Sequence, residues 1–261
     1  MRARALNQRS CAGLSVGEFL KLAARLDCVG VELRNDLGRS LFDGLSPEVA
    51  RANAQDAGLR ILGLSEVYGF NVWSKEREAE IIALRDNALA VGAETVSLIP
   101  CVDGRAVLPL RDALREVLGI FEGSGVVPLV EPIGFAASSV RTKEPLVDAI
   151  EAVADARRIK LVHDTFQHAI CGETRLFPEH TGLVHISGVS DDRVVLDEVQ
   201  DQHRRLVDAQ DRCGNLVQIE SLLAAGYQGA FSFETTDTAF IETCSEQDIR
   251  TSFEFIERCV G

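Results

Sequence analysis

The chain has 261 residues, of which 46% are hydrophobic and 26% are charged, a balance typical of globular proteins that excludes disordered and collagen-like classes. Its formal net charge of −13 disfavours nucleic acid and anionic membrane surfaces as partners, because both are bound through basic patches. No apolar run approaches the roughly 20 residues that span a bilayer and no signal peptide is evident, so we expect a soluble, cytoplasmic protein of one domain, residues 1–261.

Strand-like apolar runs alternate with helical patterns along the whole chain, which is typical of a parallel sheet built from βα units. Eight such units in about 250 residues predict a single (β/α)8 TIM barrel in the α/β class. The doubly wound sheet is the competing fold, but no glycine-rich phosphate loop follows the first strand. The predicted strands are 3–7, 29–33, 61–64, 96–99, 127–131, 160–164, 183–187 and 230–234.

Several predicted helices carry readable start and stop signals. The sequence SVGE from Ser15 is typical of a capping box, and Ser46 followed by proline predicts a helix that begins with proline in its first turn. Amphipathic patterns predict helices from Ser74 to the glycine at 92 and over 215–226, and a last helix from 245 onward closes the chain.

The two longest connections are 34–45 and 188–213. In a barrel, the loops that follow the C-terminal strand ends surround the active site. The second connection is rich in charges of both signs, which suits either substrate contact or a solvated surface excursion.

Four consecutive predicted strands each end in or near a side chain that can bind a metal: Glu131, Asp164, His185 and Glu234. Taken singly, each carboxylate fits a salt bridge at the barrel rim, and the histidine fits a core position. Together they converge on one end of the barrel, where three carboxylates would repel one another unless a cation lay between them. This donor set predicts one divalent metal ion and suits Mn²⁺, Mg²⁺, Co²⁺ or Zn²⁺.

The strand-end motifs EPIGF, HDTFQH, VHISGV and FSFET, with the segment HRRLVDAQDRCGNLVQIESLLAAGYQGAFSFE, resemble the xylose isomerase-like barrels. That family includes sugar isomerases, sugar epimerases and endonuclease IV. Within it, the chain is most similar to 2-keto-myo-inositol (inosose) isomerases. The resemblance covers essentially the whole chain, although the N-terminal half matches mainly in layout.

The resemblance implies that Glu131, Asp164, His185 and Glu234 hold the metal ion and that a polyhydroxy ketone binds it through its carbonyl and adjacent hydroxyl. An enediolate forms, with Glu131 and Glu234 as the acid and base in an order that stays open. A dehydratase of the same barrel group and a sugar-binding barrel without turnover are the alternatives. Five histidines and a charge of −13 disfavour an endonuclease IV-like enzyme, and a homodimer or homotetramer stays open.

The stretch LVHDTFQHAICGE places histidines on both sides of Asp164. Because strand side chains alternate, His163 is expected to point toward the helix layer when Asp164 faces the site. His168 is expected in the loop beyond the strand, where it can bind a substrate oxygen. Relatives commonly carry a histidine where this chain has Gln167, so either Gln167 or His168 is expected to take that role.

Further substrate contacts are assigned with an alternative for each. By similarity, Arg204 steadies substrate hydroxyls or the enediolate, with Arg205 and Arg212 as rivals for this role; otherwise it is an exposed arginine in a charged loop. Glu32 and Glu66 line the mouth of the barrel as polar contacts or form salt bridges at the rim. Trp73, with Phe70, forms an aromatic lip over the substrate, caps the barrel or belongs to an oligomer contact.

Overall fold

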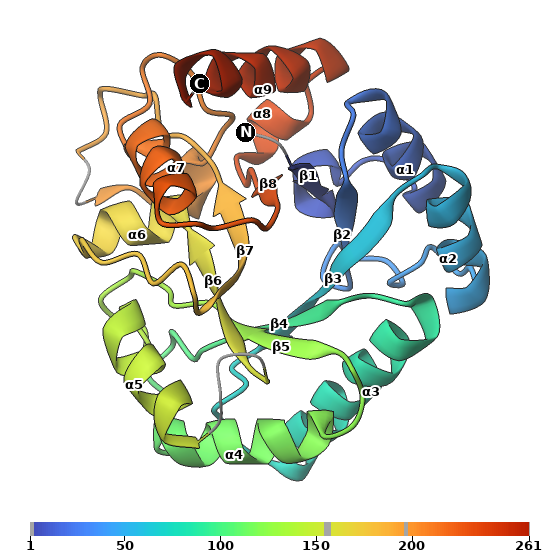
Figure 1. Cartoon of the computed structure of the whole chain (residues 1–261), viewed down its shortest axis with the longest axis vertical. Helices are drawn as coiled ribbons and strands as arrows, with labels where there is room; N and C mark the ends of the chain where they lie inside the picture. The colour runs from blue at the N-terminus through green and yellow to red at the C-terminus, as the bar shows by residue number, and fades with distance from the viewer. Residues whose placement is uncertain (1–2, 154–157, 196–197, 261) are drawn as a thin grey trace.

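The computed structural model describes residues 3–153, 158–195 and 198–260. Eight parallel strands close into a barrel in the order in which they occur along the chain, and the helices surround them (Figure 1). This architecture confirms the predicted (β/α)8 barrel and all eight predicted strand positions. The strands are β1 Arg4–Asn7, β2 Gly30–Arg34, β3 Arg60–Tyr68, β4 Thr95–Ile99, β5 Val127–Val130, β6 Lys160–Asp164, β7 Thr181–Ile186 and β8 Phe231–Phe233.

Strand lengths differ from the prediction at functionally relevant points. β3 continues four residues beyond the expected end at position 64, because its C-terminal part keeps pairing with β4 across a register shift between Ser65 and Val67. Conversely, β5 and β8 are shorter, so that Glu131 and Glu234 each lie one residue past the end of a strand.

The predicted helix caps are present. Ser15 and Glu18 form the reciprocal hydrogen bonds of a capping box, and Ser46 caps a helix with proline in its first turn. Ser74 caps the third helix, which ends at Gly92 with a φ of 74°, a conformation that favours glycine. The helices are α1 Val16–Arg25, α2 Pro47–Asp56, α3 Lys75–Val91, α4 Leu110–Phe121, α5 Lys143–Val153, α6 Thr165–Cys171, α7 Asn215–Ala224, α8 Thr238–Ile241 and α9 Glu246–Val260.

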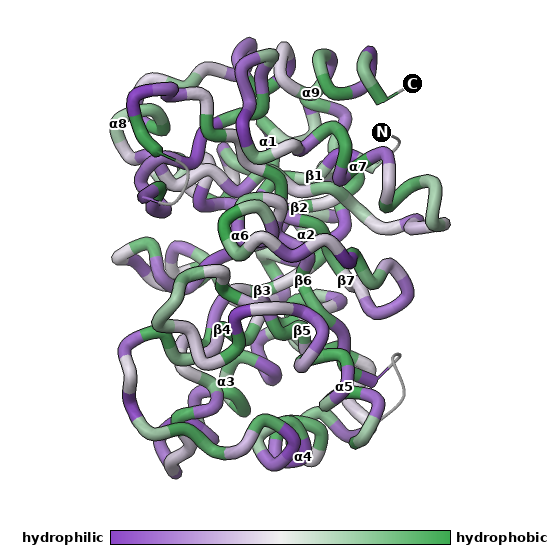
Figure 2. Tube along the Cα trace, turned by 90° about the vertical axis from the view of Figure 1, so that its left-hand side faces the viewer, coloured by the Kyte–Doolittle hydropathy of each residue, from purple (hydrophilic) through white to green (hydrophobic). Residues whose placement is uncertain are grey.

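The main hydrophobic core lies between the sheet and the helices. Hydrophilic and hydrophobic residues alternate along the helices in Figure 2, as expected for helices that cover a barrel with one face and meet solvent with the other. No helix in the described part of the chain is long and apolar enough to cross a membrane.

A smaller apolar cluster fills the lower interior of the barrel, since five strands and the residue directly before β8 contribute side chains to it. Leu129 and Val162 belong to this layer, and each stands two residues before Glu131 or Asp164 on the same chain segment. Because strand side chains alternate, the residue two positions later faces the same interior one layer higher. The cluster consists of Ala5, Leu62, Leu129, Val162, Leu183 and Ala230.

The long connection after β7 returns to the barrel mouth. It contains a short 3-10 helix, η3 Asp201–His203, and its Arg205 pairs with Gly188 in an antiparallel bridge. This bridge places the preceding Arg204, buried at 3% exposure, at the open end of the barrel. Residues 196–197 of the predicted loop lie outside the described part of the chain.

Candidate metal centre

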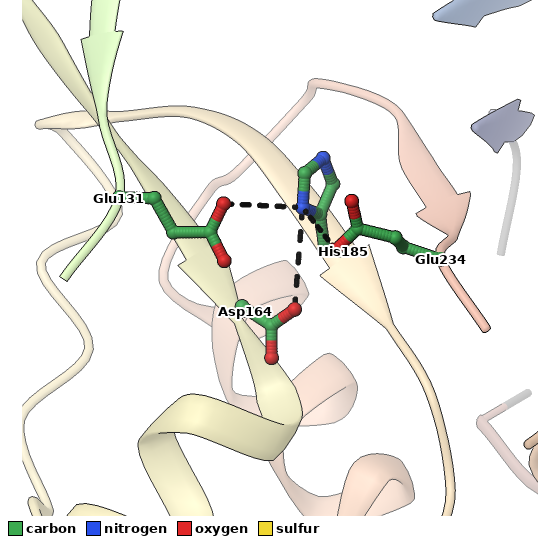
Figure 3. A group of neighbouring side chains, drawn as sticks. All are labelled: Glu131, Asp164, His185 and Glu234. Atoms are coloured by element: carbon green, nitrogen blue, oxygen red, sulfur yellow. Dashed lines mark ion pairs between the residues drawn. The ribbon is translucent and has the colours of Figure 1, made fainter. Parts of the chain in front are cut away.

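The structure brings together all four predicted metal ligands. Glu131, Asp164, His185 and Glu234 each offer one ligand atom, and these atoms lie within 4.8 Å of one another. All four side chains are buried. Figure 3 shows the carboxylates of Glu131, Asp164 and Glu234 arranged around one nitrogen of His185. The convergence follows from the fold, because the carboxyl ends of parallel strands meet at one end of the barrel.

Asp164 is held in place by the helix that follows it. The first residue of α6 comes directly after β6, and Asp164 caps this helix by accepting a hydrogen bond from the backbone N–H of Gln167 at 2.9 Å through Oδ1. Its second oxygen, Oδ2, lies 4.0 Å from Nδ1 of His185 and faces the cluster. The cap thus orients one carboxylate oxygen toward the site.

His185 presents a nitrogen that lacks a hydrogen bond. Its Nδ1 is buried without a hydrogen-bond partner among the described residues, and it lies 3.3 Å from Oε2 of Glu234 and 3.6 Å from Oε2 of Glu131. An unpaired buried polar atom is costly, and a cation coordinated by this nitrogen and the carboxylates would satisfy it. The residues therefore fit a divalent metal ion.

The electrostatics of the cluster also favour a cation. Burial, reinforced by the carboxylates of Glu234 and Asp164, holds the pKa of Glu131 well above its usual range. Burial lowers the pKa of His185, but the carboxylates of Glu32 and Glu234 outweigh burial and hold that pKa well above its usual value. Both shifts reflect an excess of negative charge in the cluster, which a bound cation would balance.

Two buried arginines flank the carboxylates. Arg204 donates through Nη2 to Asp164 at 2.5 Å and to Glu234 at 3.0 Å. Arg34 donates to Glu234 at 2.7 Å and to Glu66 at 2.6 Å. Burial raises the pKa of Glu234, but His185 and both arginines outweigh burial and hold it well below its usual range.

Sequence reasoning missed Arg34. The signal was present, because Arg34 ends β2 two residues after Glu32 and therefore faces the same side of the sheet.

Glu32 lies inside the barrel rather than at the rim. Its side chain is fully buried, accepts a hydrogen bond from Nε2 of His185 at 2.9 Å through Oε2, and accepts another from the hydroxyl of Ser232 at 2.5 Å through Oε1. The expected contact at the mouth or the rim is therefore wrong for Glu32. Its partner is the imidazole of the cluster.

A cavity of about 360 Å³ opens above the cluster. Two of the four predicted ligands, Glu131 and Glu234, line it, as do the expected substrate contacts Glu66, Gln167 and Arg204. The lining combines charged, polar and apolar side chains. The remaining lining residues are Arg9, Arg34, Tyr68, Ile99, Val102, Ile133, Phe135, Asp201 and Thr236.

Gln167 is tied to the loop after β5. Its Oε1 accepts a hydrogen bond from the backbone N–H of Gly134 at 2.9 Å, so its NH₂ group is the part left to meet a ligand. A Cβ at position 134 would lie 2.4 Å from the carbonyl oxygen of Gln167, which explains the glycine in EPIGF. His163 points to the helix layer as predicted, where its Nε2 pairs with Oε1 of Gln218 in α7 at 2.8 Å.

Two expected substrate contacts lie away from the cavity. His168 belongs to α6 rather than to a loop, and its Nδ1 lies 2.6 Å from Nζ of Lys143, which also donates to Glu173 at 2.8 Å. Trp73 is partly buried against the main core, and Phe70 is fully buried within it. The aromatic rings that line the cavity belong to other residues.

A larger groove of about 950 Å³ lies between α1 and the segment of α8 and α9. It shares only Arg9 and Thr236 with the cavity above the cluster and contains none of the four predicted ligands. We therefore place the chemistry in the smaller cavity.

With this fold and centre, the chain belongs to the xylose isomerase-like TIM barrel family, whose sequence model matches residues 20–259. A xylose isomerase domain containing protein from Salmonella typhimurium LT2 is 29% identical, with a TM-score of 0.91 over 100% of this chain and 98% of that one. An IolI protein with a bound zinc atom is 18% identical, with a TM-score of 0.86 over 99% and 98%.

More distant structures share the fold. D-psicose 3-epimerase from Clostridium cellulolyticum H10, solved with D-tagatose, is 15% identical, with a TM-score of 0.74 over 99% of both chains. A probable 3-DHS dehydratase from Bacillus anthracis is 13% identical, with a TM-score of 0.73 over 98% of both. Among curated proteins, formate–tetrahydrofolate ligase of Cereibacter sphaeroides is 30% identical over 147 residues, 56% of this chain, and the chain spans only 24% of that ligase.

Proposed function

We propose that the protein is a divalent-metal-dependent isomerase or epimerase of a keto-sugar or inosose. The observation that carries this proposal is the buried cluster of Glu131, Asp164, His185 and Glu234 below a cavity large enough for a small polyhydroxy ketone. Solved structures with the same fold support it, since they include a sugar epimerase and a protein with a bound zinc atom.

Glu131, Asp164, His185 and Glu234 would hold the metal ion. When bound, a divalent cation supplies the positive charge that stabilises an enediolate derived from a hydroxyketone. The chain buries all four donors and holds Asp164, His185 and Glu234 with hydrogen bonds, as the cap on Asp164 illustrates.

Glu131 and Glu234 handle the protons in this proposal. Both line the cavity, and in Figure 3 their carboxylates approach the centre from opposite sides of His185. One glutamate removes a carbon-bound proton, and the other returns a proton to the neighbouring carbon or to the opposite face. The outcome is a ketone moved by one position or an inverted centre.

The flanking polar groups orient the substrate. Arg204 and Glu66 line the cavity and present charged groups to substrate hydroxyls, while the NH₂ group of Gln167 offers a neutral donor. The apolar side chains of Ile133 and Phe135, which also line the cavity, suit the C–H face of a ring and exclude water from it.

The test is incubation of the metal-loaded protein with 2-keto-myo-inositol in D₂O, with and without chelator, after elemental analysis. We expect deuterium at carbon only with metal present, in a product that otherwise keeps the mass of the substrate. A product lighter by one water would identify a dehydratase, because that reaction begins with the same abstraction. Retention of every C–H bond would contradict the proposal for this substrate and favour binding without turnover.

A further inference from the structure

We propose that Glu32 is a positioning residue that fixes His185 so that Nδ1, and not Nε2, faces the metal ion. The inference rests on the proposed function in so far as that function needs a metal at this site. It assigns a role to a residue of the N-terminal half of the barrel that contributes no ligand atom to the cluster.

The hydrogen bond between Glu32 and His185 determines which nitrogen carries hydrogen. A carboxylate can only accept, so Nε2 must be the donor in the 2.9 Å contact with Oε2 of Glu32. A neutral imidazole has one N–H, and the lone pair then belongs to Nδ1, the atom that faces the three carboxylates of the cluster. The tautomer and the direction of the ring are thus set by the same contact.

Glu32 is itself held from the other side. The hydroxyl of Ser232 on β8 donates to Oε1 at 2.5 Å, while Oε2 meets His185 on β7. A carboxylate anchored through both oxygens cannot rotate without breaking a buried hydrogen bond, so the imidazole plane is restrained as well.

The burial of Glu32 is hard to explain by stability alone. Its side chain is 0% exposed, and among the described residues its ion-pair partner is His185 only; Arg34 on the same strand pairs with Asp36, Glu66 and Glu234 instead. An apolar side chain would fill a barrel interior at lower cost than a buried carboxylate. A role in orienting the metal-binding His185, and in making its Nδ1 a stronger metal ligand, accounts for a buried carboxylate at position 32.

The test measures metal affinity without substrate, by titrating the metal-free protein with Co²⁺ and following its visible absorption. Glu32→Gln can keep an oxygen near Nε2 but removes the charge, and we expect about 10-fold weaker binding; Glu32→Ala removes the contact, and we expect about 100-fold. Ser232→Ala, which removes only the group that holds Glu32, should weaken binding by a few-fold. Glu173→Gln, a carboxylate buried beside Lys143 and outside the cluster, is the matched control and should bind as the wild type.

The result that overturns the inference is an affinity within twofold of the wild type in every variant that shows a cooperative thermal unfolding transition. Ser232→Ala keeps the test decisive if both Glu32 variants fail to fold. In the Zn²⁺-loaded protein, ¹⁵N NMR should show Nε2–H and a metal-shifted Nδ1 at His185, and the reverse assignment would also overturn it. A wild-type protein that binds no Co²⁺ would instead refute the metal-dependent function.

Discussion

The two halves of the barrel contribute to the centre in different ways. Strands β5 to β8, or the residues directly after them, supply all four donor atoms of the cluster, whereas β1 and β2 supply groups that hold His185 and Glu234. Glu32 and Arg34 on β2 bind His185 and Glu234, and Asn7 on β1 donates to Glu234 at 3.2 Å. The comparison teaches that the candidate ligands come from the second half of the barrel, while two of them, His185 and Glu234, also depend on contacts from the first half.

Among the changes in the second half of the barrel, Asp164→Asn should have the largest effect on metal binding. Asparagine keeps an oxygen to cap α6, so the fold should survive, but the loss of charge should abolish tight metal binding and with it turnover. Elemental analysis of the purified variant measures the metal. Asp201→Asn is the control, because Asp201 also pairs with Arg204 at 3.2 Å but lies outside the cluster. Equal metal content in the wild type and Asp164→Asn would refute the ligand assignment.

Glu131→Gln tests proton transfer within the same half. At saturating metal we expect kcat to fall by about 10²- to 10⁴-fold, the usual contribution of a general acid or base. Steady-state kinetics, with the substrate that takes up deuterium in the D₂O test, measures this fall in kcat. A kcat within twofold of the wild type would remove Glu131 from the proton-handling pair.

Arg34→Met removes the ion pairs that β2, in the first half of the barrel, makes with Glu234 and Glu66. Removing the arginine leaves Glu234 and Glu66 without a cation that they contact at 2.7 and 2.6 Å, and breaking such a buried pair typically costs about 3–5 kcal/mol of unfolding free energy. Arg60→Met is the matched control, since its pair with Glu94 is exposed and should contribute at most about 1 kcal/mol. Equal losses in urea unfolding would contradict a supporting role.

His168 in α6 should make the stability of the fold depend on pH. Burial and the neighbouring Lys143 lower its pKa to about 4, whereas an unfolded histidine has a pKa of about 6.5. Between these values the unfolded chain binds a proton that the folded chain does not, so stability falls as pH drops from 6.5 to 4 and levels off below. The free energies of unfolding of the wild type and His168→Asn should converge as the pH drops through this range. A difference that stays constant with pH would contradict the lowered pKa of His168.

The smallest effect is expected at Trp73. This side chain packs against the main core and does not line the cavity, so Trp73→Leu should leave KM within about twofold of the wild type while it lowers stability modestly. A KM raised tenfold in a stably folded variant would contradict this prediction and show that Trp73 contributes to substrate binding.

The errors of the sequence-based assignment have physical causes. His168 was expected in a loop because a linker was expected between β6 and the next helix. Instead, α6 starts directly after β6, and only the cap formed by Asp164 shows that the strand passes into a helix without a linker. Of the three expectations for Trp73, the aromatic lip over the substrate does not fit, because the ring packs against the main hydrophobic core and does not line the cavity; a barrel cap and an oligomer contact stay predictions.

The eight strands, the barrel and the four side chains that cluster could be predicted from the chain alone. Alternation along a strand and convergence of parallel strand ends are local rules, and they place Glu131, Asp164 and Glu234 in one layer without reference to distant residues. The partner of His185 could not be read in this way, because Glu32 lies 153 residues earlier and meets it across the closed interior of the barrel. Such a contact depends on how the sheet tilts and closes, and local sequence patterns carry no information about that closure.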